Sequence, residues 1–216
     1  MPELPGAAYE LIEHLRRHAT DDERVLDAIA RTPRDRFVAE HLRPYAYDDT
    51  ALPTEAGQTI SQPTIVAMMT AALALGGDER VLDVGTGSGY QAAILALLCA
   101  EVVSVEVVES LRASAADRLQ SLGITNVTVL PATAVLGAPE HAPFDAILVA
   151  AAAPEVPPSL LAQLAPGGRL VIPVGSRDLQ ELLRVTKHAD GSTSEERLGA
   201  CRFVPLVGPG GFPSGR

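Results

Sequence analysis

The chain has 216 residues, a formal net charge of −10 and two cysteines. This length suits one α/β domain with little left over for an independent second module. Its apolar runs stay below the roughly 20 residues that a membrane-spanning helix needs, and residues 1–10 lack the pattern of a secretory signal. We therefore expect a cytoplasmic protein without a membrane partner, and two cysteines are too few for a disulfide framework.

The negative charge also bears on partners. Proteins that bind a nucleic-acid backbone cluster Lys and Arg, whereas basic pairs such as Arg16-Arg17 are short here and interleaved with acids. We therefore expect no nucleic-acid partner. His14 and His18 lie one helical turn apart, but two histidines do not make a metal site, and we expect no metal.

The first 60 residues show two kinds of pattern. Apolar residues at helical spacing predict two short helices between Tyr9 and Arg31. Residues 33–53 carry aromatics and turn formers without periodicity, which indicates an ordered loop or cap. A further helix is predicted to begin at Ser61-Gln62-Pro63, with Ser61 as its N-cap, and to end near Gly76-Gly77.

From residue 80 onward, strands and helices alternate. Strands are expected at 80–84, 102–106, 127–130, 146–149 and 169–173. One helix is expected to begin at about residue 90, and two others are expected at 110–122 and 159–164. Two later β segments, 181–186 and 201–206, are expected to pair through a turn at Asp190-Gly191. This order predicts an α/β fold with a doubly wound, mostly parallel seven-stranded sheet and an antiparallel edge hairpin. Residues 209–216, rich in Gly and Pro, are predicted to be a flexible tail.

A glycine-rich turn follows the first strand of this series, at the place where an open α/β sheet binds a nucleotide-like ligand. A dinucleotide fingerprint would need glycine at position 90, where this chain has Tyr90. The next strand ends at Glu106, whose carboxylate can accept hydrogen bonds from both hydroxyls of a ribose. A glycine turn used only for close helix packing is the alternative.

The ligand that best fits this turn is S-adenosylmethionine. It has a ribose but no phosphate, and it carries a sulfonium and an ammonium, so the acid Asp83 favours it over a dinucleotide. The residues predicted to hold this cofactor are Asp83, Gly85, Thr86, Gly87, Ser88, Gly89 and Glu106.

With those residues placed, the chain resembles the protein-L-isoaspartate (D-aspartate) O-methyltransferase family between about residues 31 and 208. The most specific segment is Gly57-Gln58-Thr59-Ile60-Ser61-Gln62-Pro63, and residues 46–48, 85–91, 143–145 and 202–206 also match. The resemblance implies a Rossmann-like methyltransferase fold in a single domain over residues 1–208. Residues 1–60 would form N-terminal helices and a substrate cap, and 61–208 the cofactor-binding core.

The resemblance also implies a reaction. A methyl group would pass to the free carboxylate of an L-isoaspartyl or D-aspartyl residue in damaged proteins and peptides, which would be the partners of a monomeric enzyme. This carboxylate is already ionised near neutral pH, so no strong general base is needed. Attack by the neighbouring backbone nitrogen on the ester gives a succinimide, whose reopening restores part of the normal aspartate.

Substrate-binding residues are expected at Gln58, Thr59, Ile60 and Ser61. The family gives the active-site role to the serine that matches Ser61, and a hydroxyl beside the amides of a helix N-terminus suits a carboxylate. Ser61 could instead only cap the helix, and Gln58 and Thr59 could form a polar turn. No covalent role is expected for Ser61, because the reaction needs no covalent intermediate.

The chain departs from the family pattern after the third predicted strand. The family has a Gly-Asp-Gly whose acid lies near the adenine amine, whereas Ala132-Thr133-Ala134 align there. Thr133 is therefore expected at the adenine, and we expect this chain to bind the cofactor more weakly than a typical member of the family does. Thr54-Glu55-Ala56 and Val107 also replace the usual residues, which bears on the choice of substrate. The altered loop before Ser61 leaves open the methylation of an aspartate on a dedicated peptide, and the missing acid near the adenine leaves open cofactor binding without turnover.

Overall fold

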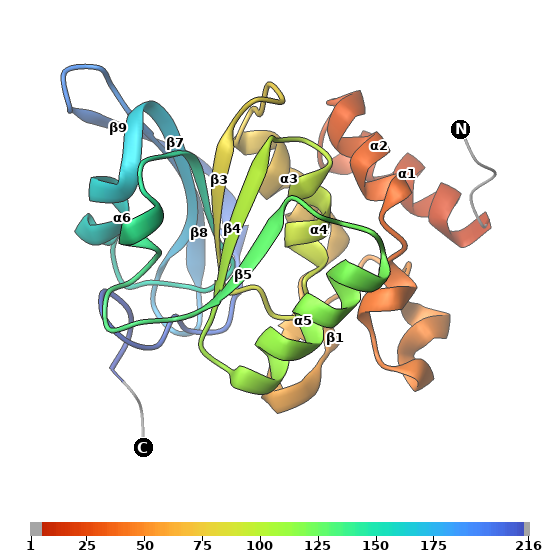
Figure 1. Cartoon of the computed structure of the whole chain (residues 1–216). Helices are drawn as coiled ribbons and strands as arrows, with labels where there is room; N and C mark the ends of the chain where they lie inside the picture. The colour runs from red at the N-terminus through yellow and green to blue at the C-terminus, as the bar shows by residue number, and fades with distance from the viewer. Residues whose placement is uncertain (1–5, 214–216) are drawn as a thin grey trace.

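The computed structural model describes residues 6–213 and is built around a seven-stranded sheet (Figure 1). In spatial order the strands are β5 (Val127–Pro131), β4 (Glu101–Glu106), β3 (Arg80–Val84), β6 (Phe144–Val149), β7 (Leu164–Gly175), β8 (Gln180–Lys187) and β9 (Thr193–Cys201). Neighbours from β5 to β7 pair in parallel, and β7, β8 and β9 pair antiparallel. The predicted α/β sheet with an antiparallel edge is confirmed.

Helices and loops cover both faces of this sheet, and the central strands are therefore apolar on both sides. The helices are α1 (Gly6–His18), α2 (Glu23–Arg31), α3 (Pro63–Ala72), α4 (Tyr90–Ala96), α5 (Glu109–Ser121) and α6 (Pro158–Gln163). Val81 and Leu82 are neighbours on β3, so they point to opposite faces, and both are fully buried. Val81 packs in one core with residues of α1–α4, and Leu82 packs in a second core with Leu160 of α6. None of the helices among residues 6–213 is long and apolar enough to cross a bilayer.

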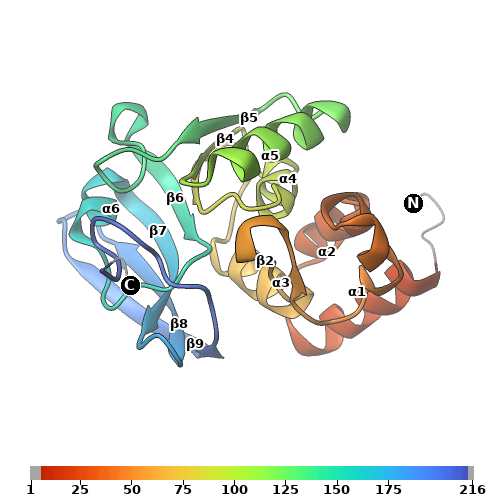
Figure 2. The ribbon, with the colours of Figure 1, turned by 90° about the horizontal axis from the view of Figure 1, so that it is seen from below.

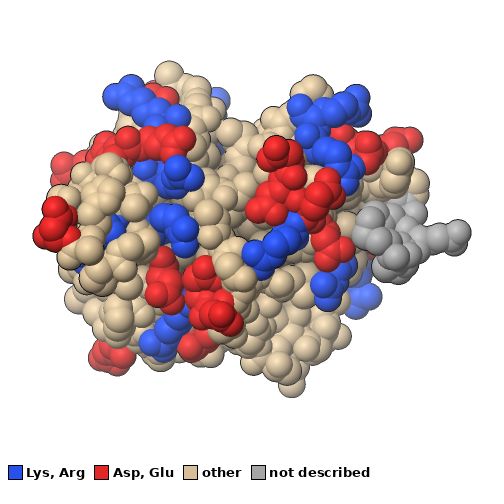
Figure 3. All heavy atoms as spheres, turned by 90° about the horizontal axis from the view of Figure 1, so that it is seen from above, with Lys and Arg blue, Asp and Glu red and all other residues tan. Residues whose placement is uncertain are grey.

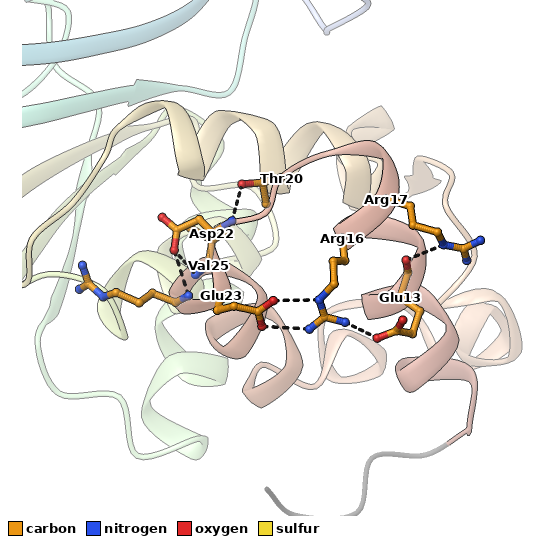
Figure 4. Close-up of polar contacts among 8 residues, drawn as sticks. Glu13, Arg16, Arg17, Thr20, Asp22, Glu23 and Val25 are labelled. Carbon is orange, nitrogen blue, oxygen red and sulfur yellow. Dashed lines mark hydrogen bonds and ion pairs between the residues drawn. The ribbon is translucent and has the colours of Figure 1, made fainter.

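Helices α1 and α2 are joined by a short turn with well-defined polar contacts (Figure 4). Asp22 is the N-cap of α2, and its Oδ1 accepts hydrogen bonds from the amides of Arg24 at 2.9 Å and Val25 at 3.4 Å. Arg16 of α1 donates two hydrogen bonds of 2.9 Å to the carboxylate of Glu23 on α2. These contacts fix the angle at which the second helix leaves the first.

We expect Asp22→Ala to lower the free energy of unfolding by about 1 kcal/mol, because the loss of a side-chain N-cap typically costs roughly 0.5–2 kcal/mol. Urea unfolding followed by circular dichroism measures the change. Asp21→Ala is the matched control, since Asp21 is exposed and carries the same charge one residue away. A loss in Asp22→Ala no larger than that in Asp21→Ala would contradict the capping role.

The region between α2 and α3 is ordered, as predicted, but it contains short elements that the sequence pattern did not indicate. They are the 3-10 helices η1 (Arg34–Phe37), η2 (Glu40–Tyr45) and η3 (Glu55–Gly57), and a small sheet of β1 (Leu52–Pro53) and β2 (Thr59–Ile60). A fourth 3-10 helix, η4 (Pro139–His141), precedes β6. The pairing of β1 with β2 folds the chain back on itself just before α3 begins.

The start of α3 differs from the prediction. The helix begins at Pro63, and its N-cap is Gln62. The side chain of Gln62 accepts no hydrogen bond from the amides of the first turn. The amide of Thr64 instead donates a hydrogen bond of 2.8 Å to Oδ1 of Asp49 from the preceding loop. The interpretation of Ser61 as the capping residue is therefore wrong.

The last strand lies earlier than predicted. β9 spans Thr193–Cys201, and only Cys201 overlaps the segment expected at 201–206. β9 is an edge strand whose polar side chains are mostly exposed, so it lacks the apolar alternation of a half-buried strand. Residues 202–206 run beside the end of β6 instead, where Pro205 forms an isolated parallel bridge with Ala152. The tail predicted at 209–216 is described only as far as residue 213, and residues 214–216 lie outside the described residues.

Candidate cofactor and substrate site

A cavity of about 290 Å³ lies at the carboxyl ends of β3 and β4. Figure 2 shows this end of the sheet from below, with the start of α3 on one side and the C-terminal segment on the other. Figure 3 shows the opposite end, where acidic and basic side chains are interleaved. Ligands of open α/β sheets bind at the carboxyl ends of the strands, so the cavity lies where the fold favours a binding site.

Several parts of the chain form the cavity wall. We call residues 58–61 the substrate segment, residues 85–89 the glycine turn, and residues 204–209 the closing segment. All residues of these three except Gly89 line the cavity, together with residues after β4 and β5. The site is thus assembled from stretches that are far apart in sequence.

The structure brings most of the predicted site residues together. Those that line the cavity are Gln58, Thr59, Ile60, Ser61, Gly85, Thr86, Gly87, Ser88, Glu106 and Thr133. Asp83 and Gly89 do not belong to the lining. They lie on the same strand and turn, and each has a separate role described below.

Gly89 serves helix packing. It has a φ of +89°, and a Cβ atom at this position would lie 3.3 Å from Cβ of Ala115 on α5. A side chain here would therefore push α4 away from α5. The alternative interpretation of the turn, close helix packing, holds for this glycine, whereas Gly85 and Gly87 border the cavity.

Glu106 has a carboxylate that the backbone holds in place. One oxygen accepts a hydrogen bond of 2.8 Å from the amide of Gly87, and the other accepts one of 2.9 Å from the amide of Val108. Each carboxylate oxygen has a second lone pair, so both can still accept from a ligand. A pair of neighbouring hydroxyls, such as those of a ribose, fits this arrangement.

Asp83 lies beneath the glycine turn and is fully buried. Its Oδ2 accepts a hydrogen bond of 2.6 Å from the hydroxyl of Ser104, which also contacts the hydroxyl of Thr86. Its Oδ1 is buried without a hydrogen-bond partner among residues 6–213. Burial raises the pKa of Asp83 to about 7, because desolvation disfavours the charged form. A positive ligand in the cavity would favour that charged form again, so this buried acid fits a sulfonium or an ammonium.

Ser61 lines the cavity immediately before α3. Its carbonyl oxygen accepts a hydrogen bond of 2.7 Å from Nη2 of Arg34. An anion site was expected at the amides of this helix N-terminus, but one of them, the amide of Thr64, is occupied by Asp49. The amide of Thr64 is therefore not available to a carboxylate ligand, whereas the hydroxyl of Ser61 lies at the cavity.

Asp49 organises the start of α3. Burial alone would raise the pKa of this carboxyl, but the amide of Thr64 and the side chains of Gln62 and Thr64 hold it below its ordinary value. Oδ2 accepts hydrogen bonds of 2.9 Å from Nε2 of Gln62 and 2.8 Å from Oγ1 of Thr64. These bonds attach the loop before β1 to the residues that follow Ser61.

Sequence reasoning did not assign the closing segment to the site. The closing segment is held there by Ala152, whose amide donates to the carbonyl of Val204 at 2.8 Å and whose carbonyl accepts from Leu206 at 2.7 Å. Further along, the amide of Phe212 donates to the carbonyl of Leu206 at 2.7 Å. The sequence signal for this segment was the family match at residues 202–206, which did not by itself place it at the cavity. Tyr90, Val66 and Met69 also line the cavity and were not predicted there.

Comparison with known proteins gives the family. The family described as Protein-L-isoaspartate(D-aspartate) O-methyltransferase matches residues 7–210. A protein-L-isoaspartate O-methyltransferase of Anaeromyxobacter dehalogenans is 57% identical over 200 residues, which cover 92% of this chain and 96% of the relative. Protein-L-isoaspartate O-methyltransferase 2 of Marinobacter nauticus is 55% identical over 193 residues, covering 89% of this chain and 88% of the relative.

Solved structures agree with these relatives. A structure of a protein-L-isoaspartate O-methyltransferase superimposes with a TM-score of 0.84 and 29% identity, covering 94% of this chain and 67% of that chain. A Plasmodium falciparum protein described by the same enzyme name, solved in complex with S-adenosyl-L-homocysteine, gives a TM-score of 0.78 and 28% identity and covers 90% of this chain and 95% of that chain. The resemblance carried by the sequence motifs is therefore confirmed, and the chain belongs to the protein-L-isoaspartate O-methyltransferase family.

Proposed function

We propose that this chain catalyses the reaction of its family, the S-adenosylmethionine-dependent methylation of the free carboxylate of L-isoaspartyl and D-aspartyl residues in damaged proteins and peptides. The observation that carries this proposal is the composition of one cavity wall. Glu106 and the glycine turn lie on one part of it, and the substrate segment with Ser61 lies on another. A methyl donor and an acceptor can therefore occupy one enclosed space.

The cofactor residues divide into two groups by what they can contact. Glu106 is placed to accept hydrogen bonds from the ribose hydroxyls, and Gly85 and Gly87 allow the ligand to approach the backbone. Asp83 supplies negative charge from beneath the turn. S-adenosylmethionine, when bound, supplies an electrophilic methyl group.

On the acceptor side, we assign Ser61 to the substrate carboxylate. The nucleophile is already anionic near neutral pH, so the protein has to orient it and exclude water rather than remove a proton. Ser61 offers a hydroxyl at the cavity, and Gln58 and Thr59 continue the same wall. Val66, Met69 and Leu206 contribute apolar surface there, which limits the water that would solvate the carboxylate.

Incubation with labelled donor and a peptide pair tests this function. One peptide contains an isoaspartyl residue, and its twin has aspartate at the same position. We expect label only in the isoaspartyl peptide, and Ser61→Ala should lower kcat at least tenfold while the donor Kd stays within about twofold. Methylation of the aspartyl twin, or of neither peptide while the donor binds, would contradict the proposal.

Thr133 allows a prediction about cofactor affinity. It lines the cavity, is exposed, and exchanges hydrogen bonds of 3.0 and 3.3 Å with the backbone of Val135. We expect Thr133→Asp to tighten donor binding by about 1 kcal/mol, the typical gain from one charge-assisted hydrogen bond to the adenine amine. Calorimetry measures this change, and Thr133→Asn is the uncharged control of equal shape. Unchanged or weaker binding in Thr133→Asp would contradict the assignment.

A further inference from the structure

Arg34 is a buried cation that the proposed mechanism has not used. It is the first residue of η1, and its side chain is fully buried. A buried charge is costly unless hydrogen bonds compensate it, and an apolar side chain of similar size would often stabilise a fold as well. The presence of arginine here therefore calls for a reason other than stability.

The contacts of Arg34 join η1 to the loop before β1 and to the substrate segment. Its Nε donates a hydrogen bond of 2.9 Å to the carbonyl of Ala46, and its Nη2 donates one of 2.7 Å to the carbonyl of Ser61 and a longer one of 3.4 Å to that of Thr50. Its Nη1 is buried without a partner among the described residues. The shortest of these three hydrogen bonds is the one to the carbonyl of Ser61.

Arg34 also contacts the cofactor side of the cavity. Its guanidinium carbon lies 4.9 Å from the centre of the Tyr90 ring. Tyr90 directly follows the glycine turn as the first residue of α4, and it lines the cavity itself. Phe37 packs edge-on against the same ring with centres 5.3 Å apart, which holds the ring in place. One planar group therefore touches both the substrate segment and Tyr90, the residue that follows the glycine turn.

These contacts need the shape of a guanidinium. It presents five donors in a fixed plane and stacks on an aromatic face, whereas an ammonium is a point charge that cannot do both. Methyl transfer is sensitive to placement, because a shift of about 1 Å in a reacting group can cost about 100-fold in rate. A rigid link between the two sides of the cavity would fix the distance between the methyl donor and the acceptor carboxylate.

We propose that Arg34 is a positioning residue for methyl transfer, which fixes the peptide group of Ser61 against Tyr90 and so sets the separation between the substrate segment and the cofactor turn. This inference rests on the proposed function. It assigns no contact between Arg34 and either reactant. Its effect should therefore appear in turnover more than in donor binding.

The test uses Arg34→Lys, which keeps the charge, and Arg34→Met, which keeps the length. We expect both to lower kcat for the isoaspartyl peptide at least tenfold, while the Kd for S-adenosylhomocysteine stays within about twofold. Hydrogen exchange of residues 58–62 should become faster in both variants. This second measurement does not depend on activity, so it separates a failure of this inference from a failure of the proposed function.

Leu26→Ala is the matched control for stability. Leu26 is a buried residue of α2 with 1% exposure, and its truncation should lower Tm without changing the substrate segment. We expect it to keep the parental kcat and the parental exchange of residues 58–62. Parental kcat or parental exchange in Arg34→Lys would overturn the inference, as would an equal loss of kcat in Leu26→Ala at a matched Tm.

Discussion

Asp83→Asn should stabilise the protein above about pH 7 and should also remove the pH dependence of donor binding. Burial raises the pKa of Asp83 to about 7, whereas an aspartate in the unfolded chain titrates near 4. Between these two values the folded protein binds more protons than the unfolded chain. The stability of the parent therefore falls as the pH rises from about 4 to 7, and above 7 the whole cost is present.

The cost is on the order of a few kcal/mol, since one pKa unit corresponds to about 1.4 kcal/mol. Asparagine has the same shape, and its oxygen can keep the hydrogen bond from Ser104 without carrying a charge. The free energy of unfolding, measured from about pH 4 to 8, should fall in the parent relative to the variant as the pH rises, because only the parent carries Asp83. Equal slopes in the two proteins would contradict the raised pKa.

Donor binding should show the opposite dependence. A cationic ligand favours the ionised form of Asp83, so binding below about pH 7 should release a proton and should tighten as the pH rises. Calorimetry in two buffers of different ionisation enthalpy detects that proton. Ser104→Ala is an informative control, because removal of the bond to Oδ2 should move the transition to higher pH. Proton release that persists in Asp83→Asn would assign it to another group.

Glu106→Ala should have the largest effect on cofactor affinity. Hydrogen bonds from ligand hydroxyls to a carboxylate contribute about 1.5–3 kcal/mol each, so loss of this side chain should weaken donor binding by about 100-fold or more. Its removal also leaves the amides of Gly87 and Val108 without their acceptor. Calorimetry with S-adenosylhomocysteine gives the Kd directly, and the melting temperature without ligand checks the fold.

Glu109→Ala is the matched control for this variant. Glu109 lies three residues further on, at the start of α5, where it is exposed and pairs with Arg112. Its removal changes the net charge equally, but Glu109 itself does not line the cavity. We expect parental affinity in the control. If Glu106→Ala bound the ligand within about threefold of the control, the assignment of Glu106 to the ribose would be wrong.

The cofactor half of the site could be predicted because its signals are local. Asp83, the glycine turn and the start of α4 are consecutive in the chain, and Glu106 ends the next strand. In a parallel sheet the carboxyl ends of neighbouring strands lie together, so sequence order alone places these residues side by side. The structure adds what order could not give, namely that Gly89 packs against Ala115 and that Asp83 lies behind the wall.

The substrate half depends on contacts between distant residues. The carboxylate of Asp49 accepts a hydrogen bond from the amide of Thr64. No local sequence pattern indicates that a residue of the preceding loop caps the helix. Proline favours the first helical position, and with Pro63 there the N-cap falls on Gln62 rather than on Ser61. The last strand was predicted at 201–206, whereas β9 spans Thr193–Cys201. As an exposed edge strand, β9 has mostly polar side chains, so its hydrophobic periodicity is weak.

The closing segment has a consequence for biosynthesis. It follows all seven strands of the sheet in the chain, so a nascent chain can form the sheet and the glycine turn before its binding chamber has a complete wall. Ligands stabilise only the states that bind them. The methyl donor should therefore protect finished molecules from proteolysis but leave chains that stop before residue 204 unprotected, and a cell rich in donor would favour complete copies over truncated ones.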